Sequence, residues 1–215
     1  MHQRMVIAGP DGDIEFFVDP IGLAASETKG IALIAHPHPL FGGTAENKVV
    51  TSIARAFRDL GCITLRPSFR GVGGSTGEHD HGVNETTDLL AVVAWARENH
   101  DPHGTLPLYL AGFSFGAFVI TRVAKKLAET GTPAKRLVLV GTAAGFVEGA
   151  RSYQTEAVAA DTLVIHGDKD ETVHLANVLA WAEPLNLPVV VVPGADHFFH
   201  RRLHLIREII IRAWR

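Results

Sequence analysis

The sequence has almost no cysteine: Cys62 is the only one among its 215 residues. A disulfide within the chain is therefore excluded. Cys62 begins an apolar segment that is typical of a strand, so we expect it to be a buried small side chain. No apolar run at the start is long enough for a signal peptide, and none elsewhere is long enough to span a membrane. We therefore expect a cytoplasmic protein without a membrane partner.

The sequence also lacks an excess of charge of either sign. Its 20 Lys and Arg residues and 23 Asp and Glu residues give a formal net charge of -3. No general attraction to nucleic acid follows from this balance, and we expect no nucleic-acid partner. The hydrophobic share of 47% is ordinary for a globular protein. Internal repeats and linker-like segments are missing, so we expect residues 1–215 to form a single domain.

From residue 30 onward, segments typical of strands alternate with segments of helical periodicity. We expect strands at residues 30–35, 62–67, 106–110, 136–140, 162–166 and 189–192, and helices at residues 47–60, 84–98, 118–127, 174–185 and 201–214. Two earlier strands, 4–8 and 13–18, flank the turn signal Pro10-Asp11-Gly12 and predict an N-terminal hairpin. This alternation predicts an α/β fold with a mostly parallel central sheet flanked by helices.

The segment Gly112-Phe113-Ser114-Phe115-Gly116 lies between one of these strands and the next helix. Gly-x-Ser-x-Gly at such a junction is the pattern of a nucleophile elbow, a sharp turn that projects the serine hydroxyl into a cleft. The turn crowds the residues two before and two after the serine, which favours glycine at both places. We predict Ser114 as the nucleophile and the amide of Phe115 as one donor of an oxyanion hole.

Two further strand ends carry the groups that a serine nucleophile needs. Asp168 and Asp170 follow the strand at 162–166, and His197 follows the strand at 189–192. Serine, acid and histidine occur in the order that accompanies this kind of elbow. We predict His197 as the base, with either aspartate able to orient it. Asp196 is expected to have a structural role.

Several motifs, taken together, resemble those of the α/β hydrolases. They are Gly112-Phe113-Ser114-Phe115-Gly116, Phe69-Arg70-Gly71-Val72-Gly73-Gly74-Ser75, His166-Gly167-Asp168-Lys169-Asp170 and Ala195-Asp196-His197. They occur in the order of that family over nearly the whole chain. The resemblance implies the α/β-hydrolase fold, and it places Asp170 at the position of the catalytic acid. Asp168 would then hold the loop through backbone hydrogen bonds.

A second resemblance concerns the segment His36-Pro37-His38-Pro39-Leu40-Phe41-Gly42-Gly43. It is similar to that of a bacterial group of small carboxylesterase-like hydrolases. The overall size also resembles the dienelactone hydrolases, which use a cysteine nucleophile where this chain has Ser114.

The loop after the strand at 30–35 should supply the second oxyanion donor. Pro37 and Pro39 have no N–H and are excluded. Counting from the strand end favours the amide of Leu40, with that of His38 as the alternative. His36 is expected to brace this loop.

The histidine pairs His36/His38 and His79/His81 do not predict a metal site, because zinc requires three or four convergent ligands. We expect no metal and no cofactor. His79 and His81 are expected to face solvent on a loop near the cleft. The glycine-rich segment 71–76 lacks the Gly-Lys-Ser/Thr ending of a phosphate-binding loop.

The sequence thus predicts a serine hydrolase, most simply a carboxylesterase that acts on a small-molecule ester through an acyl-enzyme. Residues 141–161 leave room for one short helix at most, so a minimal cap or none is expected. Phenylalanines near the strand ends would line a small apolar pocket, namely Phe41, Phe113, Phe146 and Phe198, with Phe115 and Phe199 as further candidates. The alternatives are an acyltransferase, thioesterase or peptidase with the same residues, or a non-catalytic binder of small molecules.

Overall fold

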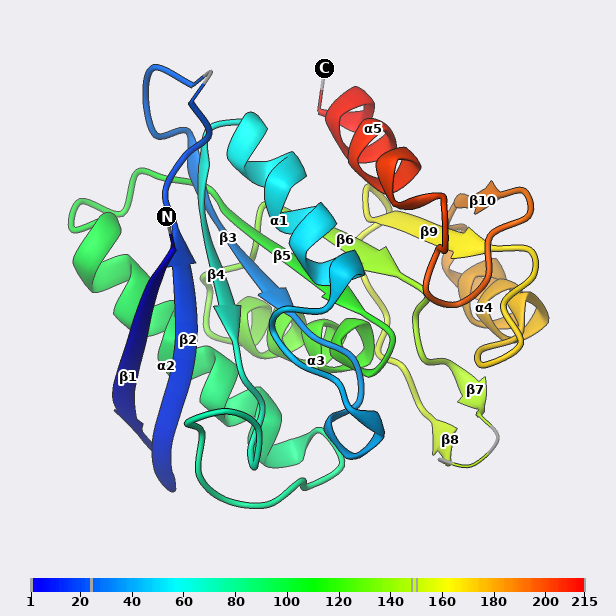
Figure 1. Cartoon of the computed structure of the whole chain (residues 1–215), viewed down its shortest axis with the longest axis horizontal. Coiled ribbons are helices and arrows are strands. Elements are labelled where there is room, and N and C mark those ends of the chain that lie inside the picture. The colour runs from blue at the N-terminus through cyan, green and yellow to red at the C-terminus, as the bar shows by residue number, and fades with distance from the viewer. Residues whose placement is uncertain (1, 24, 148, 150, 215) are drawn as a thin grey trace.

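The centre of the molecule is an eight-stranded sheet with the order β1-β2-β4-β3-β5-β6-β9-β10 (Figure 1). A computed structural model describes residues 2–23, 25–147, 149 and 151–214. The strands of the sheet are β1 (Gln3–Gly9), β2 (Gly12–Asp19), β3 (Gly30–Ala35), β4 (Cys62–Pro67), β5 (Leu108–Phe113), β6 (Arg136–Val140), β9 (Leu163–Gly167) and β10 (Val189–Val192). The first two form an antiparallel hairpin, and β2 is also antiparallel to β4. The other six strands, β4, β3, β5, β6, β9 and β10, are parallel to one another. The predicted sheet and hairpin are both confirmed.

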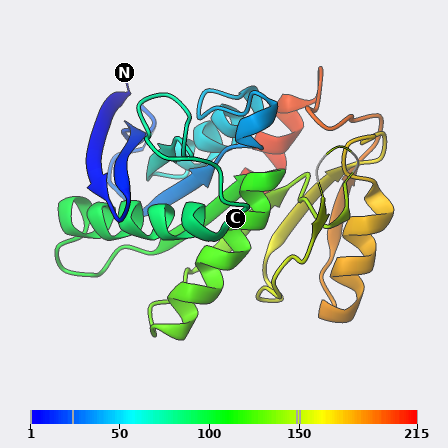
Figure 2. The same cartoon turned by 90° about the horizontal axis from the view of Figure 1, so that it is seen from below.

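Helices cover both faces of this sheet. They are α1 (Lys48–Asp59), α2 (Val83–His100), α3 (Phe115–Glu129), α4 (Leu175–Ala182) and α5 (Leu203–Ala213). One buried cluster joins the sheet to α1 and α5, and the other joins the opposite face to α2, α3 and α4. Figure 2 shows the sheet as the layer between the two sets of helices. Strands buried on both faces explain the continuous apolar runs in the sequence.

The helices lie where the sequence predicts them, with bounds shifted by one to three residues, and two of the shifts have a clear local cause. The last helix begins at Leu203 rather than residue 201, because Phe199 and Arg201 have left-handed φ values of 52° and 61° that an α-helix excludes. The helix predicted at 174–185 ends at Ala182 and continues as a short 3₁₀ turn, Glu183–Leu185, which contains Pro184. Proline inside a helix removes a hydrogen bond and clashes with the preceding turn.

The segment between β6 and β9 contains a small antiparallel hairpin instead of a cap. Its strands are β7 (Gly145–Phe146) and β8 (Ser152–Tyr153). The short helix that the sequence allowed is not found in the described part of residues 141–161. Among the described residues between β6 and β9, this hairpin is thus the one element of regular structure near the edge at which the parallel strands end. None of the described helices combines the length and apolar character needed to cross a membrane.

Candidate active site

Ser114 lies on a strained turn between β5 and α3. Its φ of 56° and ψ of -120° are unusual for a residue other than glycine. A Cβ on Gly112 would lie 2.5 Å from the amide nitrogen of Ala117, and one on Gly116 would lie 2.4 Å from the carbonyl oxygen of His36. Both positions therefore require glycine, as the sequence pattern indicated. The amide of Ser114 donates to the carbonyl oxygen of Val140 at 2.9 Å, which ties the turn to β6.

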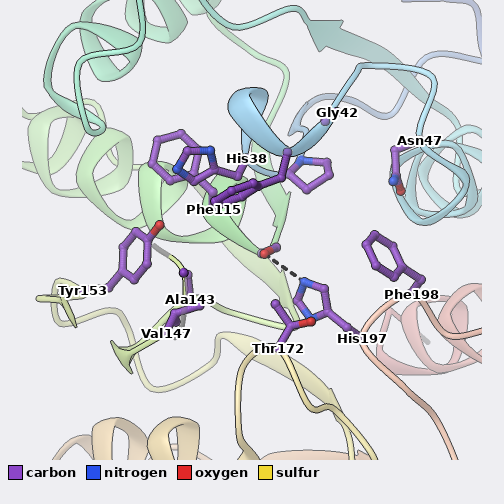
Figure 3. A pocket seen from close by; sticks show the side chains of 15 residues that line it. His38, Gly42, Asn47, Phe115, Ala143, Val147, Tyr153, Thr172, His197 and Phe198 are labelled. Atoms are coloured by element: carbon purple, nitrogen blue, oxygen red, sulfur yellow. Dashed lines mark hydrogen bonds between the residues drawn. The ribbon is translucent and has the colours of Figure 1, made fainter. Parts of the chain in front are cut away.

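Ser114, His197 and Asp170 form one chain of hydrogen bonds. Asp170 Oδ2 lies 2.7 Å from His197 Nδ1, and His197 Nε2 lies 3.0 Å from Ser114 Oγ. Because a carboxylate can only accept, Nδ1 carries the hydrogen and Nε2 is free to accept from the serine hydroxyl. All three residues are buried. Figure 3 shows the bond between the serine and His197 as a dashed line.

The other oxygen of Asp170 is held by the loop itself. Oδ1 accepts from the amides of Thr172 at 3.0 Å and Val173 at 2.8 Å. His166 Nε2 lies 2.8 Å from the carbonyl oxygen of Val173 and 3.4 Å from Asp170 Oδ2. Since the carbonyl accepts, Nε2 carries a hydrogen, and burial lowers the pKa of His166. A neutral His166 therefore braces the loop that carries Asp170.

Asp168 has a different partner. Its Oδ1 accepts from the amide of Gly194, and the next residue, Lys169, donates from its amide to the carbonyl oxygen of Ala195 at 2.9 Å. These bonds join the loop after β9 to the loop after β10. The structure thus brings Asp170, and not Asp168, to His197. Asp196 instead pairs with the exposed His200, at 2.6 Å.

A cavity of about 300 Å³ opens over Ser114 and His197. Figure 3 shows its wall, with His197 and Phe198 on one side and Tyr153 on the other. The lining residues are Pro37, His38, Phe41, Gly42, Gly43, Asn47, Ser114, Phe115, Ala143, Val147, Gly149, Tyr153, Thr172, His197 and Phe198. Of the predicted pocket residues, Phe41 and Phe198 line this cavity, as does Phe115.

Two of the predicted pocket residues lie elsewhere. Phe113 is fully buried, and its ring packs against that of His197, with 4.9 Å between the ring centres. It therefore supports the histidine and does not line the cavity. Phe146 is 67% exposed and points out from β7. The candidate Phe199 is also fully buried outside the cavity wall. A position near a strand end does not determine which way a side chain points, because successive side chains of a strand face opposite sides.

Tyr153, Val147 and Asn47 are lining residues that sequence reasoning missed. Tyr153 lies on a two-residue strand without a motif, and its neighbours gave no periodic signal. For Asn47 the sequence indicated only the start of a helix. Asn47 does cap α1, where its side chain accepts from the amide of Val49 at 2.8 Å.

The loop after β3 forms a 3₁₀ turn over Pro39–Phe41. The amide of Leu40, the favoured oxyanion donor, points to its own neighbour, His38 Nδ1, at 3.3 Å. The amides of Phe41 and Gly43 both donate to the carbonyl oxygen of His38, at 3.2 and 3.0 Å. Within the described residues, the amide of His38 has no such acceptor. The amide of Phe115, at the start of α3, has no acceptor within its helix.

His36 connects this loop to the loop after β4. Its Nδ1 lies 2.7 Å from the carbonyl oxygen of Pro37, and its Nε2 accepts from the amide of Phe69 at 2.9 Å. The ring is fully buried, and this burial lowers the pKa of His36 to about 4. A neutral His36 thus braces the loop.

His79 does not face solvent, so that expectation is wrong. Its side chain is only 5% exposed, and Nδ1 lies 2.7 Å from Oε1 of the buried Glu85. Its ring lies 4.6 Å from that of His38 and 5.1 Å from that of Phe115. Glu85 at the start of α2 provides a polar anchor that draws the loop inward. In the part of the chain that is described, no group of histidine, cysteine and acidic residues has a metal-binding arrangement.

Known proteins are similar to this chain in sequence and in fold. A family model described as Thioesterase domain matches residues 54–190, more than half of the chain. The uncharacterized protein RP471 of Rickettsia prowazekii is 32% identical over 201 residues, which cover 89% of this chain and 79% of that protein.

Two solved structures are similar over almost the whole chain. XC6422 from Xanthomonas campestris, an α/β serine hydrolase without a lid, has a TM-score of 0.86 and 36% identity, and the match covers 99% of this chain and 93% of that one. An α/β serine hydrolase homologue from Coxiella burnetii has a TM-score of 0.84 and 37% identity, covering 98% of this chain and 96% of the other. The chain therefore belongs to the thioesterase-domain family of the α/β-hydrolase superfamily, and its fold is that of the members without a lid.

Proposed function

We propose that this protein is a serine carboxylesterase that acts on small soluble esters. The hydrogen-bonded chain from Asp170 through His197 to Ser114, which ends at the floor of an open cavity, carries this proposal. A serine hydroxyl is a weak nucleophile until an adjacent base takes its proton. No cofactor takes part in the reaction.

The geometry supports a two-step mechanism. Ser114 Oγ attacks the ester carbonyl carbon while its proton passes to His197 Nε2. The alcohol then leaves with that proton, and the acyl group stays on Ser114. Water attacks the acyl-enzyme, again giving a proton to His197, and the acid leaves as Ser114 recovers its hydrogen. Asp170 keeps His197 in the tautomer that accepts at Nε2 and stabilises the charged ring that forms in each step.

Two backbone amides are proposed to bind the oxyanion. Phe115 follows the nucleophile at the positive end of α3, where an anion is favoured. For the second donor, the contacts favour His38 over Leu40, because the Leu40 amide already points to His38 Nδ1. His38 also lines the cavity beside Ser114.

Thioester hydrolysis is the second candidate, and the match to the Thioesterase domain model favours it. The same residues would serve, since an ester and a thioester differ in the leaving group and share the acyl-enzyme. Oxygen and sulfur esters of one acyl group, compared by kcat/KM, separate the two. A p-nitrophenyl ester and a matched acyl thioester with release of a free thiol are suitable substrates.

The test of the proposal is turnover combined with covalent labelling. A fluorophosphonate probe should label the wild-type protein at Ser114, and Ser114→Ala should lose both labelling and turnover, with kcat falling about 10⁶-fold. His197→Ala should behave like Ser114→Ala. His200→Ala is the matched control, because His200 is exposed and pairs with Asp196. Near-normal turnover in folded Ser114→Ala would refute the assignment, and a protein that binds esters without labelling would be a binder.

A further inference from the structure

A second cavity, of about 400 Å³, lies next to the active-site cavity. It is formed by the start of α3, the loop before α2 and the segment that includes β8. Its wall includes His81, Phe118, Arg122, Arg151, Gln154 and Glu156. We call it the arginine pocket. No step of the proposed mechanism uses it.

Aromatic side chains connect the linings of the two cavities. Tyr153 lines the active-site cavity, on the side away from His197 in Figure 3. Its ring lies 5.1 Å from that of Phe118 and 5.0 Å from Arg151 Cζ. Phe118 and Arg151 both line the arginine pocket. Arg151 is thus the charged side chain that packs against the Tyr153 wall of the active-site cavity, within reach of a substrate chain that extends from Ser114 along Tyr153.

Two guanidinium groups share one aromatic ring in the arginine pocket. Arg122 Cζ lies 5.8 Å and Arg151 Cζ lies 5.5 Å from the centre of the Phe118 ring. Aromatic rings attract cations, but they do not cancel the repulsion between two of them. Two positive charges on the wall of one cavity favour a bound anion.

The described residues do not neutralise these charges. Neither arginine is ion-paired with a described carboxylate, and Arg122 Nε is buried without a hydrogen-bond partner among the described residues. Arg151 donates to the carbonyl oxygen of His81, a neutral group. Glu156 is on the wall, but it pairs with Lys125 at 2.9 Å. Buried donors without partners are rare in proteins, so the free Nε indicates a missing acceptor.

We propose that the arginine pocket binds a carboxylate or phosphate group on the substrate, so that the enzyme prefers acyl groups with an anionic far end. The planar guanidinium fork suits both of these oxyanions. The inference rests on the proposed hydrolase function and adds a substrate class to it.

The experiment compares two series of p-nitrophenyl esters. One series consists of the monoesters of adipic, suberic and sebacic acids, each with a free terminal carboxylate, and the other has that carboxylate capped as a methyl ester. Release of p-nitrophenolate is measured for both. We expect kcat/KM to favour the free carboxylate about tenfold to a hundredfold at one of the lengths, the range expected for hydrogen bonds to a charged group.

Substitutions then locate the preference. Arg122→Gln should reduce the ratio of the two kcat/KM values to near one, and Arg151→Gln should lower it as well. Lys126→Gln is the control, since it removes the same charge from the same helix at an exposed ion pair with Glu129. It should leave the ratio unchanged. Equal rates for free and capped esters at every length, or a preference that Arg122→Gln retains, would overturn the inference.

A binding measurement separates this inference from the hydrolase proposal. Monomethyl adipate and hexyl phosphate are titrated calorimetrically into Ser114→Ala, which needs no turnover. Binding that Arg122→Gln abolishes supports the pocket, and the tighter ligand identifies the preferred oxyanion. If neither ligand binds, the arginine pocket is not an anion site, even where the wild-type enzyme hydrolyses the capped esters.

Discussion

Two aspartates stand two positions apart on the loop after β9 and have different partners. Asp170 Oδ2 contacts His197 at 2.7 Å, whereas Asp168 accepts from the amide of Gly194. We predict that Asp170→Asn lowers kcat by roughly 10³–10⁴, because an amide at this place favours the wrong imidazole tautomer. Asp168→Asn should cost much less in kcat. Steady-state kinetics of both variants tests this, and the reverse order of effects would make Asp168 the acid.

His36 makes the stability of the protein depend on pH. Its pKa in the folded protein is lowered to about 4 from 6.5 by burial, and its Nε2 is an acceptor that protonation would remove. The contribution of His36 to the free energy of unfolding is fully present above about pH 6.5 and is lost as the pH falls towards 4. Over this range the unfolded chain binds a proton at His36 that the folded protein does not bind. We expect this residue to contribute a loss of about 3 kcal/mol by pH 4.

The measurement for His36 is the free energy of unfolding by urea between pH 4 and 8. His36→Asn should be less stable than wild type at pH 7, with a shallower dependence on pH. The difference between the two slopes isolates this histidine from the other titrating groups. Parallel slopes would show that His36 does not resist protonation.

Residues with fixed chemical roles could be predicted from the sequence, and residues chosen by packing could not. Ser114, Asp170 and His197 were identified by their motifs, and the structure brings them into one hydrogen-bonded chain. Phe146 and Phe113 were assigned to the pocket wrongly, because nearness to a strand end does not say which way a side chain points. The favoured amide, Leu40, was chosen by counting, which could not reveal that the His38 side chain faces it.

The contact between α3 and β3 controls the position of the nucleophile. A Cβ on Gly116 would lie 2.4 Å from the carbonyl oxygen of His36, and backbone at that distance must move. We predict that Gly116→Ala destabilises the protein by about 1–3 kcal/mol. It should also lower kcat more than tenfold, since Ser114 and the Phe115 amide move with the helix.

Gly131→Ala is the control at the other end of α3. Its φ is +76°, so alanine is strained there too, but no atom lies within 4 Å of the added Cβ. We expect a loss of stability of about 1 kcal/mol with unchanged kcat. Thermal unfolding and esterase kinetics are measured on both variants. If Gly116→Ala kept full activity, the close approach of α3 to β3 would not fix the nucleophile.

Most elements were predictable from the sequence because their signals are local. Strands β3, β4, β6 and β10 have the expected bounds, since continuous apolar runs between polar turns mark them clearly. Hairpin β7–β8 was missed, because two-residue strands leave no periodic pattern. The start of α5 was placed too early, since the left-handed turn at Phe199 and Arg201 contains no glycine that would mark it in the sequence.

The molecule as a whole has an open cleft. Between β6 and β9 the described residues supply only a small hairpin, and the similar structure from Xanthomonas campestris also has no lid. Each buried methylene of an acyl chain contributes about 0.8 kcal/mol, but only as far as the cavity extends. For neutral esters we therefore predict that kcat/KM is flat or falls beyond about C6, without a jump at a lipid interface.

This prediction is checked with neutral p-nitrophenyl esters from about C2 to C16, assayed above and below micelle formation. A maximum at a long chain, or a sharp rise above the micelle concentration, would show that part of the molecule closes over the acyl group.

The sheet order also has a consequence for folding. Ser114 follows the central strand β5, but its two proposed partners follow β9 and β10, at one edge of the sheet and late in the chain. A ribosome that has released β5 and α3 has thus made a serine that still lacks its base. During synthesis the growing chain carries an unreactive hydroxyl until the last strands dock. During refolding, activity should therefore return only when β9 and β10 join the sheet. A folding intermediate in which the central strands are already paired would still be inactive.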